Sequence, residues 1–132
     1  GDSVMALWNV PDHQDDHVER AVLAAVDMLR WLEVGNQNWQ QKYGVTIHLA
    51  IGIHTGEAVV GNFGSETRME FTCVGDTVNI AARLENLARP QQILVSADVR
   101  RAIGDIVDVY PLGSHRLPGR LEPLELFEVS GE

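Results

Sequence analysis

Residues 45–53 alternate apolar with polar or small side chains in the most regular pattern of the sequence. The apolar members are Val45, Ile47, Leu49, Ile51 and Ile53. A period of two is typical of a β-strand with one buried face, so the run predicts a strand over 45–53. Thr55 and Gly56 predict a turn, with 58–60 as the returning strand of a hairpin. The chain is therefore expected to build a sheet, and its other elements must cover the apolar face of that sheet.

Two segments carry apolar residues at the spacing of three and four that is typical of an amphipathic helix. The first covers 17–33, and Asp15 or Asp16 is placed to cap its N-terminus. We expect this helix to fray or bend after residue 33 and to stop at Gly44. The second helix covers 77–88.

Shorter apolar runs predict further elements. Strands are expected at 4–8, 69–74, 93–95, 107–112 and 124–129, a loop or arm at 61–68, and a short helix from Ala97 capped by Ser96. The order strand, helix, hairpin, helix, strand predicts an α+β fold, with the helices on one face of the sheet.

Composition limits the class of protein. With 132 residues, of which 45% are hydrophobic, the chain is long enough for one domain with a core. Ten basic and 19 acidic side chains give a net charge of −9, which argues against nucleic-acid binding. No apolar run approaches the roughly 20 residues that cross a bilayer, and the opening residues do not have the pattern of a signal peptide. The single Cys73 excludes an internal disulfide and is expected to be a small apolar filler.

The helix predicted at 77–88 carries the clearest chemical pattern. Asn79 and Arg83 are four residues apart and share one face, which Asp76 and Asn86 extend by about one turn each way. A guanidinium is suited to phosphate, and an amide can hold a ribose. Together they can stabilise charge that develops on a phosphoryl group. On spacing alone, the alternative is a solvated polar face with a capping aspartate.

Asp2 is a second candidate, since a carboxylate at the edge of an apolar strand can bind Mg²⁺ on a substrate phosphate. The alternative is a turn residue. His48 and His54 are expected to be surface or hydrogen-bonded groups rather than metal ligands. Because the chain opens at Gly1 without a methionine and runs directly into an apolar stretch, we expect it to be a piece of a longer protein.

Several of these segments together resemble the catalytic domain of class III adenylate and guanylate cyclases, and most of all the bacterial adenylate cyclases. The segments are GDSVMA (1–6), GIHTGE (52–57), VGNFGS (60–65), GDTVNIAARL (75–84) and LPGR (117–120). They follow one another in the family's order and span essentially the whole chain. The resemblance implies a single ferredoxin-like α+β cyclase domain over 1–132, with helices packed on an antiparallel-rich sheet.

The resemblance also implies a mechanism. In the family, head-to-tail dimers hold two Mg²⁺ or Mn²⁺ ions on ATP through two aspartates of one protomer, and Asp2 matches the second of these. Asn79 and Arg83 match the residues that reach in from the other protomer, where the amide orients the ribose and the guanidinium stabilises the transition state. The ribose 3′-oxygen then attacks the α-phosphorus and pyrophosphate leaves.

Further positions follow from the same resemblance. Thr72, with Phe71 beside it, matches the site that reads the base, and a threonine there favours adenine over guanine. Pro118 stands where family members often carry a lysine for the triphosphate, a role that Arg120 is expected to take over. The family's first strand, with its first metal aspartate, is not in this chain, so the chain is expected to be inactive alone.

The resemblance predicts an adenylate cyclase that makes cyclic AMP in the cytoplasm, within a protein that also carries sensor domains; whether that protein has a membrane anchor is left open. Two alternatives stay open. One is a catalytically silent cyclase-like module that dimerises and regulates a neighbour, and the other is a guanylate cyclase. Retention of Asp2, Asn79 and Arg83 together favours an enzyme over the silent module.

Overall fold

The computed structural model describes residues 3–65, 68–116 and 120–130, with the backbone alone for residues 63, 65 and 68–72. In this part of the chain it contains three helices and six strands. They are α1 (His17–Tyr43), β1 (Ile51–Ile53), β2 (Val59–Ser65), β3 (Arg68–Val74), α2 (Asp76–Leu87), β4 (Ile93–Ser96), α3 (Ala97–Ile103), β5 (Asp108–His115) and β6 (Leu124–Ser130).

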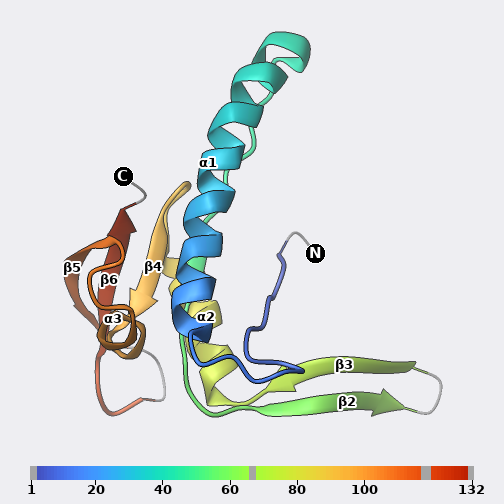
Figure 1. Ribbon diagram of the computed structural model, residues 1–132, viewed down its shortest axis with the longest axis vertical. Helices are drawn as coiled ribbons and strands as arrows, with labels where there is room; N and C mark the ends of the chain where they lie inside the picture. Colours follow the sequence, from blue (N-terminus) through green and yellow to red (C-terminus); the bar gives the residue numbers. More distant parts are fainter. Residues whose placement is uncertain (1–2, 66–67, 117–119, 131–132) are drawn as a thin grey trace.

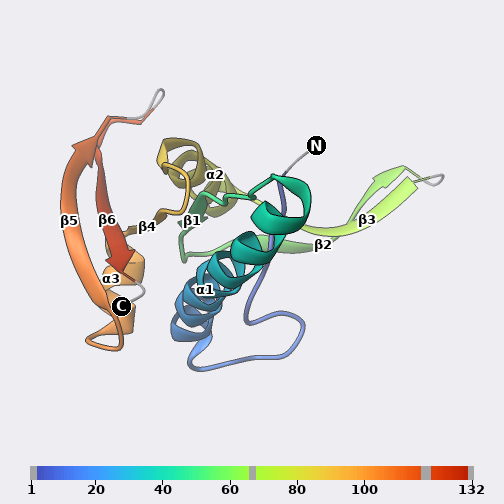
Figure 2. The same cartoon turned by 90° about the horizontal axis from the view of Figure 1, so that it is seen from above.

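Four strands form the main sheet, in the order β1-β4-β6-β5 (Figures 1 and 2). β1 lies parallel to β4, with Ile51 opposite Ile93, while β4, β6 and β5 pair antiparallel. Three helices pack on or beside this mostly antiparallel sheet, which confirms the predicted α+β fold. The order of elements from α2 onward also agrees with the predicted order.

The helices cover both faces of the sheet, so the prediction that they share one face is wrong. Alternation along β4 sends Ile93 and Val95 into a core with α1 and α3, while Leu94 packs on the opposite side against α2. Figure 2 shows α2 on one side of the sheet and α1 with α3 on the other. The sequence pattern could not reveal this, because β4 is buried on both faces and therefore does not alternate.

α1 runs unbroken for 27 residues to a left-handed Gly44 at φ 68°, so the stop is confirmed and the predicted fraying is wrong. A single glycine inside a helix lowers helix stability by only about 1 kcal/mol, so the neighbouring turns keep the helix intact at Gly35. Asp16 occupies the N-cap position, but its carboxylate bonds Arg20 at 2.6 Å instead of capping the backbone. That bond holds the pKa of Asp16 below its usual value.

Only the last three residues of the predicted strand 45–53 form a strand. Residues 45–50 lack a neighbouring strand, and their backbone bonds isolated partners instead, one of them Gln91 N, which donates to Leu49 O at 2.6 Å. The Asn36 amide accepts from Ile47 N at 2.7 Å and donates to Ile47 O at 2.8 Å, while Gln91 Oε1 accepts from Leu49 N at 2.9 Å. The apolar side chains of Val45 and Ile47 stay about half exposed.

Two further strand predictions are wrong. Residues 4–8 form no strand and are mostly exposed, because they pair with no other described strand. The segment after Gly56 does not fold back on β1. β2 pairs instead with β3, from Val59 opposite Val74 to Ser65 opposite Arg68. The pair forms a separate two-stranded arm that projects from the body in Figures 1 and 2.

Candidate functional site

Helix α2 presents Asn79 and Arg83 on its exposed side. Both side chains are exposed, while the adjacent Ile80 and Leu84 are only 6% and 0% exposed and anchor the helix to the sheet. Among the described residues, neither Asn79 nor Arg83 makes a side-chain hydrogen bond or an ion pair. An amide and a guanidinium, one helical turn apart, are therefore available to a ligand or a second subunit.

The segment 52–57, which comprises the last two residues of β1 and the four that follow, supports α2. A Cβ on Gly52 would lie 2.6 Å from Ala81 O and 2.8 Å from Leu84 C, so only a glycine lets β1 and the helix backbone approach this closely. Farther along, Thr77 Oγ1 donates to Glu57 O at 2.6 Å. The motif GIHTGE thus fixes where α2, and with it Asn79 and Arg83, stands on the sheet.

His54 ties the end of β1 to the start of α3. Its Nδ1 lies 2.7 Å from Ser96 Oγ in a hydrogen bond, and Ser96, 1% exposed, also accepts from Val99 N as the predicted N-cap of α3. Partial burial of the imidazole lowers the pKa of His54, and the Arg120 charge lowers it further, against opposing effects of Asp98 and Asp76. His54 is the hydrogen-bonded group that the sequence predicted.

Arg120 reaches the first turn of α2. Its Nη1 donates to Asp76 Oδ1 at 2.8 Å and to Asp76 Oδ2 at 2.7 Å. The fold therefore brings Arg120 to the helix that carries Asn79 and Arg83. The sequence had singled out Asp76 as part of this helix face, but it held no signal for the contact with Arg120, because the two residues are 44 positions apart.

Three other predicted positions are only partly described. Thr72 and Phe71 lie on β3, opposite Gly61 and Asn62, and their side chains are outside the described part. Asp2, the predicted metal ligand, is likewise outside the described residues. Within 3–65, 68–116 and 120–130, no three His, Cys, Asp or Glu side chains are grouped to hold a metal ion.

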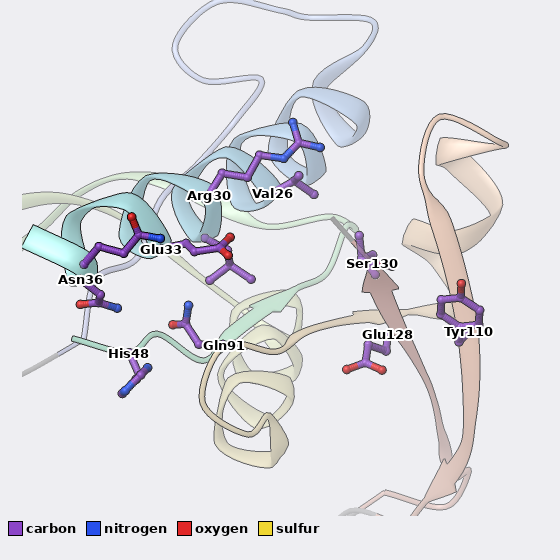
Figure 3. A pocket seen from close by; sticks show the side chains of 12 residues that line it. Val26, Arg30, Glu33, Asn36, His48, Gln91, Tyr110, Glu128 and Ser130 are labelled. Atoms are coloured by element: carbon purple, nitrogen blue, oxygen red, sulfur yellow. The ribbon is translucent and has the colours of Figure 1, made fainter. Parts of the chain in front are cut away.

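A groove of about 870 Å³ lies away from α2, between α1 and strands β5 and β6, next to His48 and Gln91 (Figure 3). Its polar lining includes Arg30, Glu33, His48, Tyr110 and Glu128. Several of these groups already have partners, such as Thr46 for His48 and Gln92 for Glu128. None of the predicted site residues whose side chains are described lines it, so the groove and the α2 face are separate features.

The sequence matches the family model "Adenylate and Guanylate cyclase catalytic domain" over residues 1–128. Adenylate cyclase 1 of Rhizobium meliloti (strain 1021) is 38% identical over 133 residues, which cover 99% of this chain and 20% of that protein. This chain thus spans a fifth of that relative's length. None of the described helices has the length and apolar character needed to cross a membrane.

Two solved structures have a similar fold. The adenylyl cyclase CyaB from P. aeruginosa has a TM-score of 0.87 and 29% identity, covering 93% of this chain and 64% of that one. The guanylyl cyclase Cya2 also has a TM-score of 0.87, with 35% identity, covering 94% of this chain and 63% of that one. The similarity extends to solved structures of both specificities.

Proposed function

Because this chain belongs to the family of adenylate and guanylate cyclase catalytic domains, we propose that its protein converts ATP to cyclic AMP and pyrophosphate. The observation that carries the proposal is the α2 face. Asn79 and Arg83 are exposed on a helix whose other side is buried, and no described residue forms a hydrogen bond or ion pair with their side chains. Side chains exposed in this way are free to bind a ligand or a second subunit.

Each side chain has a role that its chemistry supports. The Asn79 amide, with both a donor and an acceptor, orients the ribose so that the 3′-oxygen faces the α-phosphorus. The Arg83 guanidinium donates to the oxygens of that phosphoryl group as negative charge grows on them. Arg120 adds a second cation for the triphosphate, held on the same helix by Asp76.

We propose a homodimer, head to tail, in which α2 of one protomer faces the nucleotide held by the other. Divalent Mg²⁺ or Mn²⁺, with Asp2 as a protein ligand, would supply positive charge at the triphosphate. The described residues add no carboxylate cluster to that ligand. We also propose sensor domains elsewhere in the protein. Adenylate cyclase 1 of Rhizobium meliloti supports this, because the aligned region covers 20% of its length.

ATP is the proposed substrate because a threonine at position 72 can accept a hydrogen bond from the adenine amino group. The adenylate cyclase of Rhizobium meliloti, at 38% identity, supports the same choice. The second candidate is GTP, which the 35% identity with the guanylyl cyclase Cya2 favours. Product analysis with each nucleotide separates the two.

The experiment uses the full-length protein with ATP or GTP and Mn²⁺ or Mg²⁺, with cyclic nucleotide and pyrophosphate quantified by chromatography. We expect cyclic AMP, and a fall in kcat/KM worth about 2–4 kcal/mol for Asn79→Ala and for Arg83→Ala. Asn38→Ala and Arg101→Ala, which also remove exposed helical side chains, serve as matched controls and are expected to keep full activity. Full activity in both α2 variants would contradict the assigned roles, and nucleotide binding without turnover would favour the silent module.

A further inference from the structure

The contact between Asp76 and Arg120 joins two distant parts of the chain. One guanidinium nitrogen of Arg120 lies between both carboxylate oxygens of Asp76, at 2.8 and 2.7 Å. The contact links the segment that leads into β6 with the first turn of α2, across 44 positions of sequence. The Arg120 side chain is 36% exposed and that of Asp76 is 68% exposed.

Asp76 lies on the same side of α2 as the two proposed catalytic residues. Asn79 follows it by three positions and Arg83 follows Asn79 by four, so the three stack along one helix face. Through Asp76, the Arg120 guanidinium is therefore brought to the N-terminal end of that face. Two guanidinium groups then flank one amide on a short stretch of helix.

The contact between Asp76 and Arg120 contributes little to the free energy of folding. Exposed ion pairs contribute little to folding, because water screens them and two side chains lose freedom. The contact has a larger effect on the affinity for an anionic ligand. Arginine has a long, flexible side chain, and a cation that is already held in place loses less freedom when a polyanion binds.

We propose that Asp76 is a positioning residue that holds Arg120 beside Asn79 and Arg83, so that the three side chains meet the nucleoside triphosphate together. The inference rests on the proposed function. Asp76 itself, an anion, does not touch the phosphates and acts through Arg120.

The first test measures KM and kcat for ATP in the full-length protein. Asp76→Ala is expected to raise KM about two- to fivefold and to leave kcat within a factor of two, since one exposed charged contact is lost. Arg120→Ala is expected to raise KM about tenfold, and adding Asp76→Ala to it should change nothing more. Asp76→Glu, which keeps the carboxylate, should recover most of the lost affinity.

A matched control removes a similar ion pair elsewhere. Asp16 pairs with Arg20 at the start of α1 at 2.6 Å, with side chains about half exposed. Asp16→Ala should leave KM unchanged. Thermal melting of every variant separates loss of fold from loss of binding, and Asp76→Asn serves as a milder replacement if Asp76→Ala does not fold.

Several results would overturn the inference. One is an unchanged KM in Asp76→Ala. Another is a lowered KM in that variant, which would mean that Asp76 competes with the nucleotide for Arg120. A third is a double variant in which the effects of the two substitutions on KM multiply. Titration with a fluorescent ATP analogue gives the same comparison as dissociation constants. A wild-type protein that binds the analogue without turnover refutes the proposed activity, while the binding ratios still decide the role of Asp76. Absence of binding refutes both.

Discussion

Replacement of Gly52 by alanine tests whether β1 sets the position of α2. The new methyl group would lie 2.6 Å from Ala81 O and 2.8 Å from Leu84 C, and it would also press on Glu85 N. All three are backbone atoms of α2, which cannot turn aside as a side chain can. Since ordinary contact begins near 3.4 Å, the helix must move away from β1 by about 0.8 Å or more.

Such a shift has two consequences of known size. Overpacking of this kind costs about 1–3 kcal/mol of folding free energy, which lowers the melting temperature by at least about 3 °C. A displacement near 1 Å of catalytic side chains costs up to about a hundredfold in rate. Gly52→Ala is therefore expected to lower kcat of the full-length protein by about ten- to a hundredfold, through Asn79 and Arg83.

Gly104→Ala is the matched control. Its methyl group would meet nothing within 4 Å, but its φ of 58° strains any residue other than glycine. This variant should lose about 1 kcal/mol of stability and keep its kcat, because α2 stays in place. Calorimetry and a cyclase assay on both variants decide the matter. A Gly52→Ala protein with wild-type kcat and melting temperature would refute the close approach of β1 and α2.

Three further predictions use the same methods. Leu84→Ala, at a fully buried position, should cost about 2–5 kcal/mol in denaturant unfolding, and Leu87→Ala, which removes a 37% exposed side chain, less than half as much. Because burial lowers the pKa of His54 below its unfolded value of 6.5, stability should be unaffected above pH 6.5 and should fall as the pH drops toward the folded pKa. A His54→Asn variant that lost stability equally over this range would contradict that reading. Asn36→Ala removes both bonds to Ile47 and should speed hydrogen exchange at residues 45–50, whereas unchanged exchange would show that other contacts hold the segment.

Local patterns in the sequence predicted the elements that local interactions determine. The helix expected at 77–88 spans Asp76–Leu87, because an amphipathic face with apolar residues at helical spacing is a property of the segment itself. Ser96 as the cap of α3 and the stop at Gly44 were predictable for the same reason. Cys73 is buried, as expected of a small apolar filler.

The failures concern interactions between distant segments. Residues 45–50 have a strand's alternation, but a strand also needs a neighbouring strand along its length, and only isolated bonds from Asn36 and Gln91 are found within the described residues. The predicted hairpin after Gly56 is wrong for a similar reason, because β2 pairs with β3 and not with β1.

In the candidate site, too, the features set by local sequence were predictable and those set by the tertiary fold were not. Asn79 and Arg83 were predictable because they are four residues apart on one helix, and their exposure leaves the predicted roles open to experiment. The support that Gly52 gives α2 and the contact of Arg120 with Asp76 depend on the tertiary fold, which no short pattern encodes. The predicted roles of Asp2, Thr72 and Phe71 stay predictions.

We propose that α2 of one protomer acts on nucleotide held by the other, and mixing two inactive variants tests this claim. Asp2→Ala removes the predicted metal ligand, and Arg83→Ala removes the cation of the α2 face. In an equal mixture, half of the dimers contain both variants and one of their two sites is intact, so about a quarter of wild-type cyclase activity should return. A mixture no more active than the mean of the separate variants would contradict the claim.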